Sequence, residues 1–303
     1  MLRSLPRVLP FIAVLALALP PAHAQVVSRR IGRATVRADH AAAWPGGLLI
    51  VHLDGLRRAA ATHAILDGRR CPFFPAGGRL RALVPIPATF PPGPATLGIE
   101  IRTRTGRQRV ALPVLIATRA YPERTVVIPE PKRALVAQRS AVRDGRQLQK
   151  LLRTVSGVQH WHGPFKPPVA AEPAYSYGAP MSYVGASPVE ATADSIHGEY
   201  HRGLDYQVPL GTAVQAPAAG IVLAAGPLGL AGETVVVDHG QGVISTLCHL
   251  SRVDVREGAW IDARAAVGLS GESGVAAEPH LHWAVYVLGV AVDPRVLVGR
   301  PLG

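Results

Sequence analysis

Two short motifs decide the fold of this chain: His201-Arg-Gly-Leu-Asp205 and His280-Leu-His282. Between them stands His249, in the segment Cys248-His-Leu-Ser251, and the surrounding sequence is rich in valine, alanine and glycine. Neutral imidazole and carboxylate are the ligands that zinc takes in catalytic sites, where three protein ligands leave one position open. We therefore expect side chains from these motifs to converge on one metal ion.

The second motif reads as the start of a β-strand. The residues after it, Trp283 to Leu288, are mostly β-branched or aromatic, as is typical of strands. Successive side chains of a strand alternate between its faces, so His280 and His282 are expected to project to the same side. In the first motif, Gly203 and the Tyr-Gln-Val-Pro that follows Asp205 favour a turn entering a strand. Such a turn can bring His201 and Asp205 to one ion.

The ordered set of His-x-x-x-Asp, His-Leu-Ser and His-x-His resembles the lysostaphin/LytM-type zinc metallopeptidases, which cut peptidoglycan cross-links. The resemblance covers roughly residues 160 to 298. The chain departs from the family at Glu278-Pro279, where Gly-Pro is usual, a change that removes no ligand. Supporting segments also resemble the family: Gly211–Gly220, Gly232–Gly240, Val255–Gly258, Gly268–Gly271 and Val292–Pro294.

The resemblance implies a role for each of five side chains. His201, Asp205 and His282 would be the zinc ligands, and His249 and His280 the catalytic pair that does not bind the metal. Zinc polarises a scissile carbonyl and lowers the pKa of water to about 7. Histidine, with an ordinary pKa near 6.5, can accept or donate a proton at working pH. One of the pair would assist attack and the other would stabilise the oxyanion or protonate the leaving amine; which does which stays open.

The expected function is therefore that of a secreted, zinc-dependent endopeptidase hydrolysing the peptide cross-links of peptidoglycan. The alternative is a non-catalytic or autoinhibited wall-binding regulator of other hydrolases on the same fold, because the long segment 169–200 could cover the cleft. A metallopeptidase for Gly-rich proteins is a third reading. Lipoyl and biotinyl carrier domains share similar strand-turn patterns but need a lysine, and no lysine follows Lys166.

The chain as a whole is expected to be mostly β. Residues 25–118 predict an immunoglobulin-like β-sandwich, because 48–53 form an apolar run and 96–104 alternate with 108–116 around Thr105-Gly-Arg107. Residues 119–168 predict a connector, broken by prolines, with a short helix over 142–155. Residues 169–303 would form the peptidase domain, for which the resemblance implies a duplicated hybrid β-sandwich or barrel.

The first 24 residues have the pattern of a secretory signal. Arg3 and Arg7 precede a short apolar run, and Ala22-His-Ala24 is a small-residue cleavage site. We expect Gln25 to begin the mature protein, with no transmembrane anchor remaining. The location would be secreted, periplasmic or in the cell envelope.

The amino-acid composition limits which partners the protein can bind and whether it forms disulfides. The chain has 303 residues, 48% of them hydrophobic, and a net charge of +12. This charge either reflects an arginine-rich composition or attracts anionic cell-wall polymers. No basic segment is interleaved with aromatic residues, which argues against nucleic acid. Cys71 and Cys248 are expected to be buried and unpaired, because two cysteines do not make a disulfide framework.

Other histidines are interpreted as structural. His160-Trp-His162 has the spacing of a metal pair on a strand, but the Pro-rich segment after it favours a structural role. His239, in Asp238-His-Gly240, is expected at a turn or behind the ligands. His197 and Glu199 are expected to be solvated.

Overall fold

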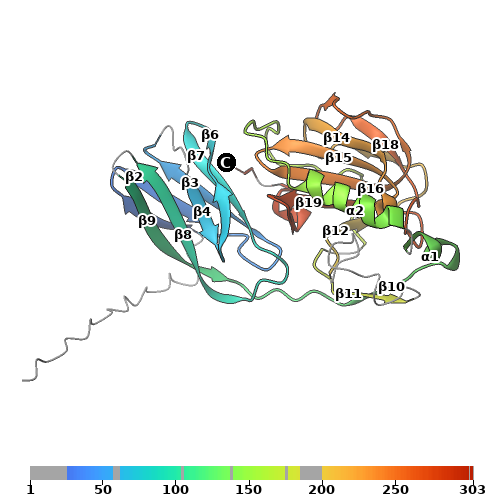
Figure 1. Ribbon diagram of the computed structural model, residues 1–303, viewed down its shortest axis with the longest axis horizontal. Coiled ribbons are helices and arrows are strands. Elements are labelled where there is room, and N and C mark those ends of the chain that lie inside the picture. The colour runs from blue at the N-terminus through green and yellow to red at the C-terminus, as the bar shows by residue number, and fades with distance from the viewer. Residues whose placement is uncertain are drawn as a thin grey trace, which may run out of the picture.

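The computed structural model describes residues 26–56, 62–103, 106–136, 139–174, 177–184, 200–299 and 301–302. Over these residues the chain is mostly β, as expected, and forms two β lobes that lie side by side (Figure 1). The expected signal segment, 1–24, lies outside them. None of the helices in the described ranges has both the length and the apolar character needed to cross a bilayer.

The N-terminal lobe contains two antiparallel sheets. The first has the order β1-β2-β3-β7-β6, with bounds Val26–Ile31, Ala34–Asp39, Leu48–Asp54, Arg79–Pro85 and Phe74–Ala76. The second has the order β5-β4-β8-β9, with bounds Arg69–Pro72, His63–Leu66, Gly93–Thr103 and Gly106–Ile116.

The predicted hairpin is present as β8 and β9, and its alternation decides which face is buried. Leu97, Ile99 and Ile101 are at most 2% exposed. They share one apolar cluster with Val51 and Leu53 of β3, which belongs to the other sheet. The two sheets therefore enclose a common core, because a strand with apolar residues at every second position buries one face. The immunoglobulin-like connectivity stays a prediction.

The connector contains two helices where the sequence predicted one. α1 spans Glu130–Val136 and α2 spans Arg139–Leu152, which ends three residues before the predicted helix. The prolines of this segment predict breaks, but Pro131 lies in the first turn of α1, where its missing N–H is not needed. Leu148 and Leu152 of α2 join the core of the C-terminal lobe. The connector also supplies β10, Arg124–Val127, which pairs in parallel with β11, Met181–Val184.

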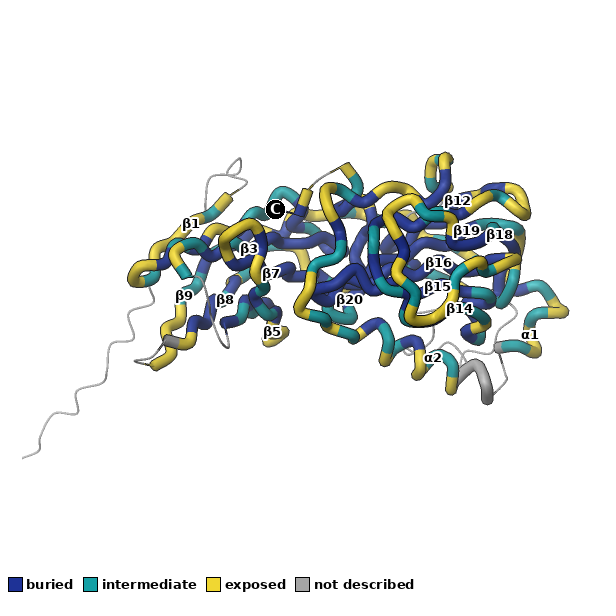
Figure 2. The backbone as a smooth tube through the Cα atoms, turned by 90° about the horizontal axis from the view of Figure 1, so that it is seen from above, coloured by how far each residue is buried: buried dark blue, intermediate teal, exposed yellow. Residues whose placement is uncertain are grey.

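The C-terminal lobe is built on a nine-stranded sheet whose central strands are buried (Figure 2). Its main path is β12-β19-β16-β15-β14-β17, with bounds Gly203–Tyr206, Leu281–Val287, Val243–Val253, Glu233–Gly240, Gly220–Pro227 and Trp260–Ile261. Branching from this path are β13, Ala213–Gln215, β18, Ala266–Ser270, and β20, Val290–Val292. Two 3-10 turns complete it: η1, Gly229–Ala231, and η2, Pro294–Val296.

A buried arginine ties the two lobes together. Arg81 of β7 has no exposed surface. Its guanidinium donates to the carbonyl of Leu302 at 3.1 Å and to the side-chain oxygens of Gln159 and Gln241 at 2.9 and 2.5 Å. Because a buried polar group is costly unless it is hydrogen-bonded, these contacts fix how the lobes meet.

Glu100 of β8 gives the N-terminal lobe a predictable acid sensitivity. Hydrogen bonds from Arg70, then from Arg109, lower its pKa from 4.5 to about 2, against an opposing effect of burial. A carboxyl with a depressed folded-state pKa stabilises above its unfolded value and loses that contribution as pH falls. We expect Glu100→Gln to lower the melting temperature at pH 7, and the gap to wild type to narrow between pH 4.5 and 2.

Thermal melts followed by circular dichroism at pH 7, 4 and 2.5 measure this gap. Glu257→Gln, at an exposed position, is the matched control. A gap for Glu100→Gln that does not change with pH would contradict the interpretation.

Candidate metal centre

The site is built on two neighbouring strands and the irregular segment before one of them. Asp205 of β12 stands directly opposite His282 of β19 in the antiparallel ladder. Residues paired in this way project to the same face of a sheet, so the backbone ladder brings the carboxylate to the imidazole. His201 lies just before β12 in an irregular segment, not in the predicted turn, and its side chain closes the group.

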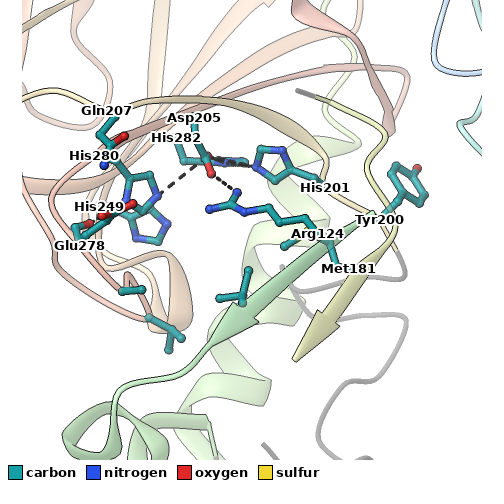
Figure 3. Close-up of a pocket in the computed structure, with 13 residues that line it drawn as sticks. Arg124, Met181, Tyr200, His201, Asp205, Gln207, His249, Glu278, His280 and His282 are labelled. Carbon is teal, nitrogen blue, oxygen red and sulfur yellow. Dashed lines mark hydrogen bonds and ion pairs between the residues drawn. The ribbon is translucent and has the colours of Figure 1, made fainter. Parts of the chain in front are cut away.

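Three ligand-type atoms form a tight triangle (Figure 3). Oδ1 of Asp205 lies 3.1 Å from Nε2 of His201 and 2.7 Å from Nδ1 of His282. The two imidazole nitrogens are 3.1 Å apart. All three residues are buried, with at most 9% of their surface exposed. The structure thus brings together the three residues predicted to bind metal.

Gly203 explains why the first motif needs a glycine between its histidine and its aspartate. A Cβ at this position would lie 2.8 Å from Cε1 and Nε2 of His282 and 2.5 Å from the carbonyl oxygen of Trp283. A side chain there would displace the imidazole from the triangle. The glycine therefore permits the close approach of β12 to the ring.

Electrostatics favour the protonation states that metal binding requires. Burial alone would raise the pKa of Asp205, but His201 and His282 outweigh it and hold that pKa well below 3.8. Burial lowers the pKa of His282 below 6.5, against the attraction of Asp205. At neutral pH the carboxylate is thus ionised and His282 is neutral, the forms in which these groups bind a metal.

His249 reaches the site through an irregularity of β16. The ladder between β15 and β16 shifts register there, so that Cys248 and His249 together stand opposite Thr234. His249 has φ 61°, in the left-handed region that only a few non-glycine residues adopt. Such a bulge re-aims a side chain and is frequent next to active sites. Cys248 stays in the ladder opposite His282, and both it and Cys71 are free, buried thiols, as expected.

His280 completes the group beside His249. The centroids of the two rings are 4.7 Å apart. Nδ1 of His249 lies 2.9 Å from the carbonyl oxygen of Ser273, and Nδ1 of His280 lies 2.8 Å from that of Glu278. A carbonyl only accepts, so each Nδ1 must donate, which leaves Nε2 of each neutral ring as an acceptor. Burial, and then the neighbouring histidines, hold the pKa of His249 well below 6.5.

A hollow of about 70 Å³ opens on these five side chains. Its wall includes Arg124 and Val126 of β10 and Met181 of β11, which sequence reasoning missed. Nη1 of Arg124 lies 2.5 Å from Oδ2 of Asp205. Arg124 precedes Asp205 by 81 residues and belongs to no motif, so no local pattern indicated this contact.

The other predicted candidates do not join the hollow. His239 lies within β15 and not, as expected, at a turn or behind the ligands: it is buried, and its ring nitrogens contact the carbonyl of Ala219 and the hydroxyl of Ser245. The ring of His160 packs edge-on against Trp260 at 5.3 Å, and His162 is exposed. These positions agree with the structural interpretation. His197 and Glu199 lie outside the described residues.

A buried His-Asp-His triangle with two further histidines beside it offers three ligands of the kinds that catalytic zinc sites use. Comparison with known proteins agrees with that class. Residues 199–294 match Peptidase family M23. The chain therefore carries an M23 peptidase domain, as its resemblance to lysostaphin and LytM-type enzymes implied.

Curated relatives match over the same region. The chain is 34% identical over 93 residues to peptidoglycan DD-endopeptidase ShyA of Vibrio cholerae, which covers 31% of this chain and 22% of that protein. It is 35% identical over 94 residues to DD-carboxypeptidase/endopeptidase Mpg of Neisseria meningitidis, again covering 31% and 22%. The chain thus spans about a fifth of the length of these relatives.

One solved structure matches both lobes. It is described as a putative peptidase M23 from Pseudomonas aeruginosa, with 29% identity and a TM-score of 0.59. The match covers 85% of this chain and 95% of that one. The two-lobed architecture is therefore shared with that structure.

Proposed function

We propose that the protein is a zinc-dependent endopeptidase that hydrolyses the peptide cross-links of peptidoglycan outside the cytoplasmic membrane. The observation that carries this is the triangle of His201, Asp205 and His282, with the acceptor nitrogens of His249 and His280 beside it. The substrate class follows from the relatives, which are named peptidoglycan DD-endopeptidase and DD-carboxypeptidase/endopeptidase. The predicted signal segment supports the location.

The donor set fits zinc. Zinc binds imidazole nitrogen at about 2.0–2.1 Å and carboxylate oxygen at a similar distance, which separates tetrahedral ligands by roughly 3.3 Å. The three atoms of the triangle lie 2.7 to 3.1 Å apart, close to that spacing. When bound there, zinc would polarise the scissile carbonyl and make water a stronger nucleophile.

His249 and His280 would move the protons of the reaction. Each ring is fixed by a backbone carbonyl at Nδ1, so Nε2 is the atom that takes up a proton and later returns one to the leaving amine. The lowered pKa of His249 keeps its ring neutral and able to accept at neutral pH. Which ring serves attack and which serves the leaving group stays open.

Removal of metal tests this function. Protein stripped with a chelator is expected to lose digestion of purified sacculi, and to regain it with one equivalent of zinc. Mass analysis of the released fragments identifies the bond cut. Metal-free protein that digests at the untreated rate would contradict the zinc mechanism. Stoichiometric zinc without release of new peptide ends would instead favour a non-catalytic or autoinhibited wall-binding regulator.

A further inference from the structure

The carboxylate of Asp205 uses its two oxygens for different partners. Oδ1 faces the imidazoles of His201 and His282, whereas Oδ2 accepts from Nη1 of Arg124 at 2.5 Å. Figure 3 shows Arg124 extending from β10 to the carboxylate, with its guanidinium in the same hollow as His249 and His280. The arginine belongs to the connector, outside the residues 199–294 that match the family.

The backbone that carries Arg124 is anchored on both sides of it. Upstream, the hydroxyl of Tyr121 donates to the carbonyl of Pro45 at 2.5 Å. At Arg124 itself, the backbone N–H donates to the carbonyl of Pro180 at 2.9 Å. Downstream, Nζ of Lys132 donates to the carbonyls of Glu272 and Ala276 at 2.6 and 2.7 Å, on the rim of the C-terminal lobe. The guanidinium is therefore presented to Asp205 by a fixed strand.

Loss of this contact would leave Asp205 poorly restrained. The residue is only 3% exposed, so water cannot freely replace a partner on Oδ2. A buried acceptor without a donor destabilises the protein, and more so when the acceptor is charged. The carboxylate would relieve that cost by rotating, which turns Oδ1 away from the imidazoles. The positive charge of Arg124 disfavours a cation nearby, and the negative charge of the Asp205 carboxylate offsets this repulsion.

We propose that Arg124 is a positioning residue for Asp205, so that a connector segment outside the family domain completes the metal centre. The inference rests on the proposed metal site. Groups that orient a metal ligand from behind affect the affinity for the metal, because they fix the ligand's rotation. Arg124 contacts the oxygen that faces away from the imidazoles, and the hollow beside it remains open, which favours positioning over blockage.

Zinc affinity of the full chain tests the proposal, measured by competition with a chromophoric chelator. We expect Arg124→Gln to bind zinc roughly 10- to 100-fold more weakly than wild type. Arg124→Lys keeps a charged donor and is expected to fall between the two. Arg146→Gln, the same change at an exposed position on α2, is expected to bind as wild type does. A merely structural role would lower the melting temperature of the zinc-free Arg124→Gln variant while leaving its zinc affinity at the wild-type value.

The possible results distinguish failure of the positioning role of Arg124 from failure of the proposed zinc-dependent function. Wild type that binds no zinc would overturn the proposed function. Wild type that binds one zinc, with equal affinity in Arg124→Gln, would overturn the role of Arg124 alone. Tighter zinc or faster sacculus digestion in that variant would show that Arg124 blocks the site. Should Arg124→Gln not fold, Arg124→Lys decides, because wild-type affinity there rejects the role.

Discussion

His282→Ala is expected to lose both zinc and hydrolysis. The substitution leaves two protein ligands where catalytic zinc sites use three. Lewis-acid stabilisation by a metal is worth several kcal/mol, and each 1.4 kcal/mol is about tenfold in rate, so digestion of sacculi should fall roughly a thousandfold or more. Metal content by elemental analysis and release of soluble fragments measure the two losses.

The matched control is His162→Ala, which removes an exposed histidine outside the hollow. It is expected to keep one zinc per chain and the wild-type rate. Because His282 is buried beside the core, the melting temperature of zinc-free His282→Ala should be compared with that of zinc-free wild type. A folded His282→Ala protein that digests sacculi as fast as wild type would exclude the proposed ligand set.

His249→Asn is expected to keep zinc but to slow hydrolysis by about 10²- to 10⁴-fold, the usual contribution of a proton-transferring side chain. Asparagine is the sharper replacement because it tolerates the left-handed backbone that His249 adopts at φ 61°. The asparagine amide cannot take up the proton that Nε2 of His249 would accept. The variant therefore loses proton transfer while the β-bulge is kept.

The two variants are expected to differ in zinc content: His282→Ala loses zinc, whereas His249→Asn keeps it. One equivalent of zinc together with slow digestion assigns His249 to the proton transfers, whereas loss of zinc would assign it to the ligand set. Wild-type rates in a folded, zinc-loaded His249→Asn protein would remove His249 from the mechanism and leave His280 as the sole candidate of the pair.

The sequence predicted the parts of the site that follow from local pattern. His201, Asp205 and His282 were recognisable because their residue types and order are those of a metal centre, and β19 because β-branched and aromatic residues follow His280. The hairpin of β8 and β9 was readable from strict alternation of apolar residues. The domain boundaries at 118 and 168 stay predictions.

The features that the sequence did not predict depend on distant contacts or on register. The segment Cys248-His-Leu-Ser251 gives no sign of the bulge, which exists only in the pairing of β16 with β15. In the sequence, nothing distinguishes Arg124 from the other arginines of this strongly basic chain. Its role depends on β10, which places it against Asp205. α1 was missed because Pro131 was weighed as a breaker rather than by its place in the first turn.

The pairing of Asp205 with His282 across β12 and β19 makes the floor of the metal centre part of the sheet itself. Two ligands held by backbone ladder bonds keep their separation whether or not an ion is present, so loading and loss of metal would require no refolding. β10 and β11, which also line the hollow, form a separate two-stranded sheet, so that side of the hollow can move without changing the separation of Asp205 and His282. The proposed site would thus combine a rigid sheet, which carries Asp205 and His282, with a second sheet. The distance between the two sheets would decide which substrate segments can enter the hollow.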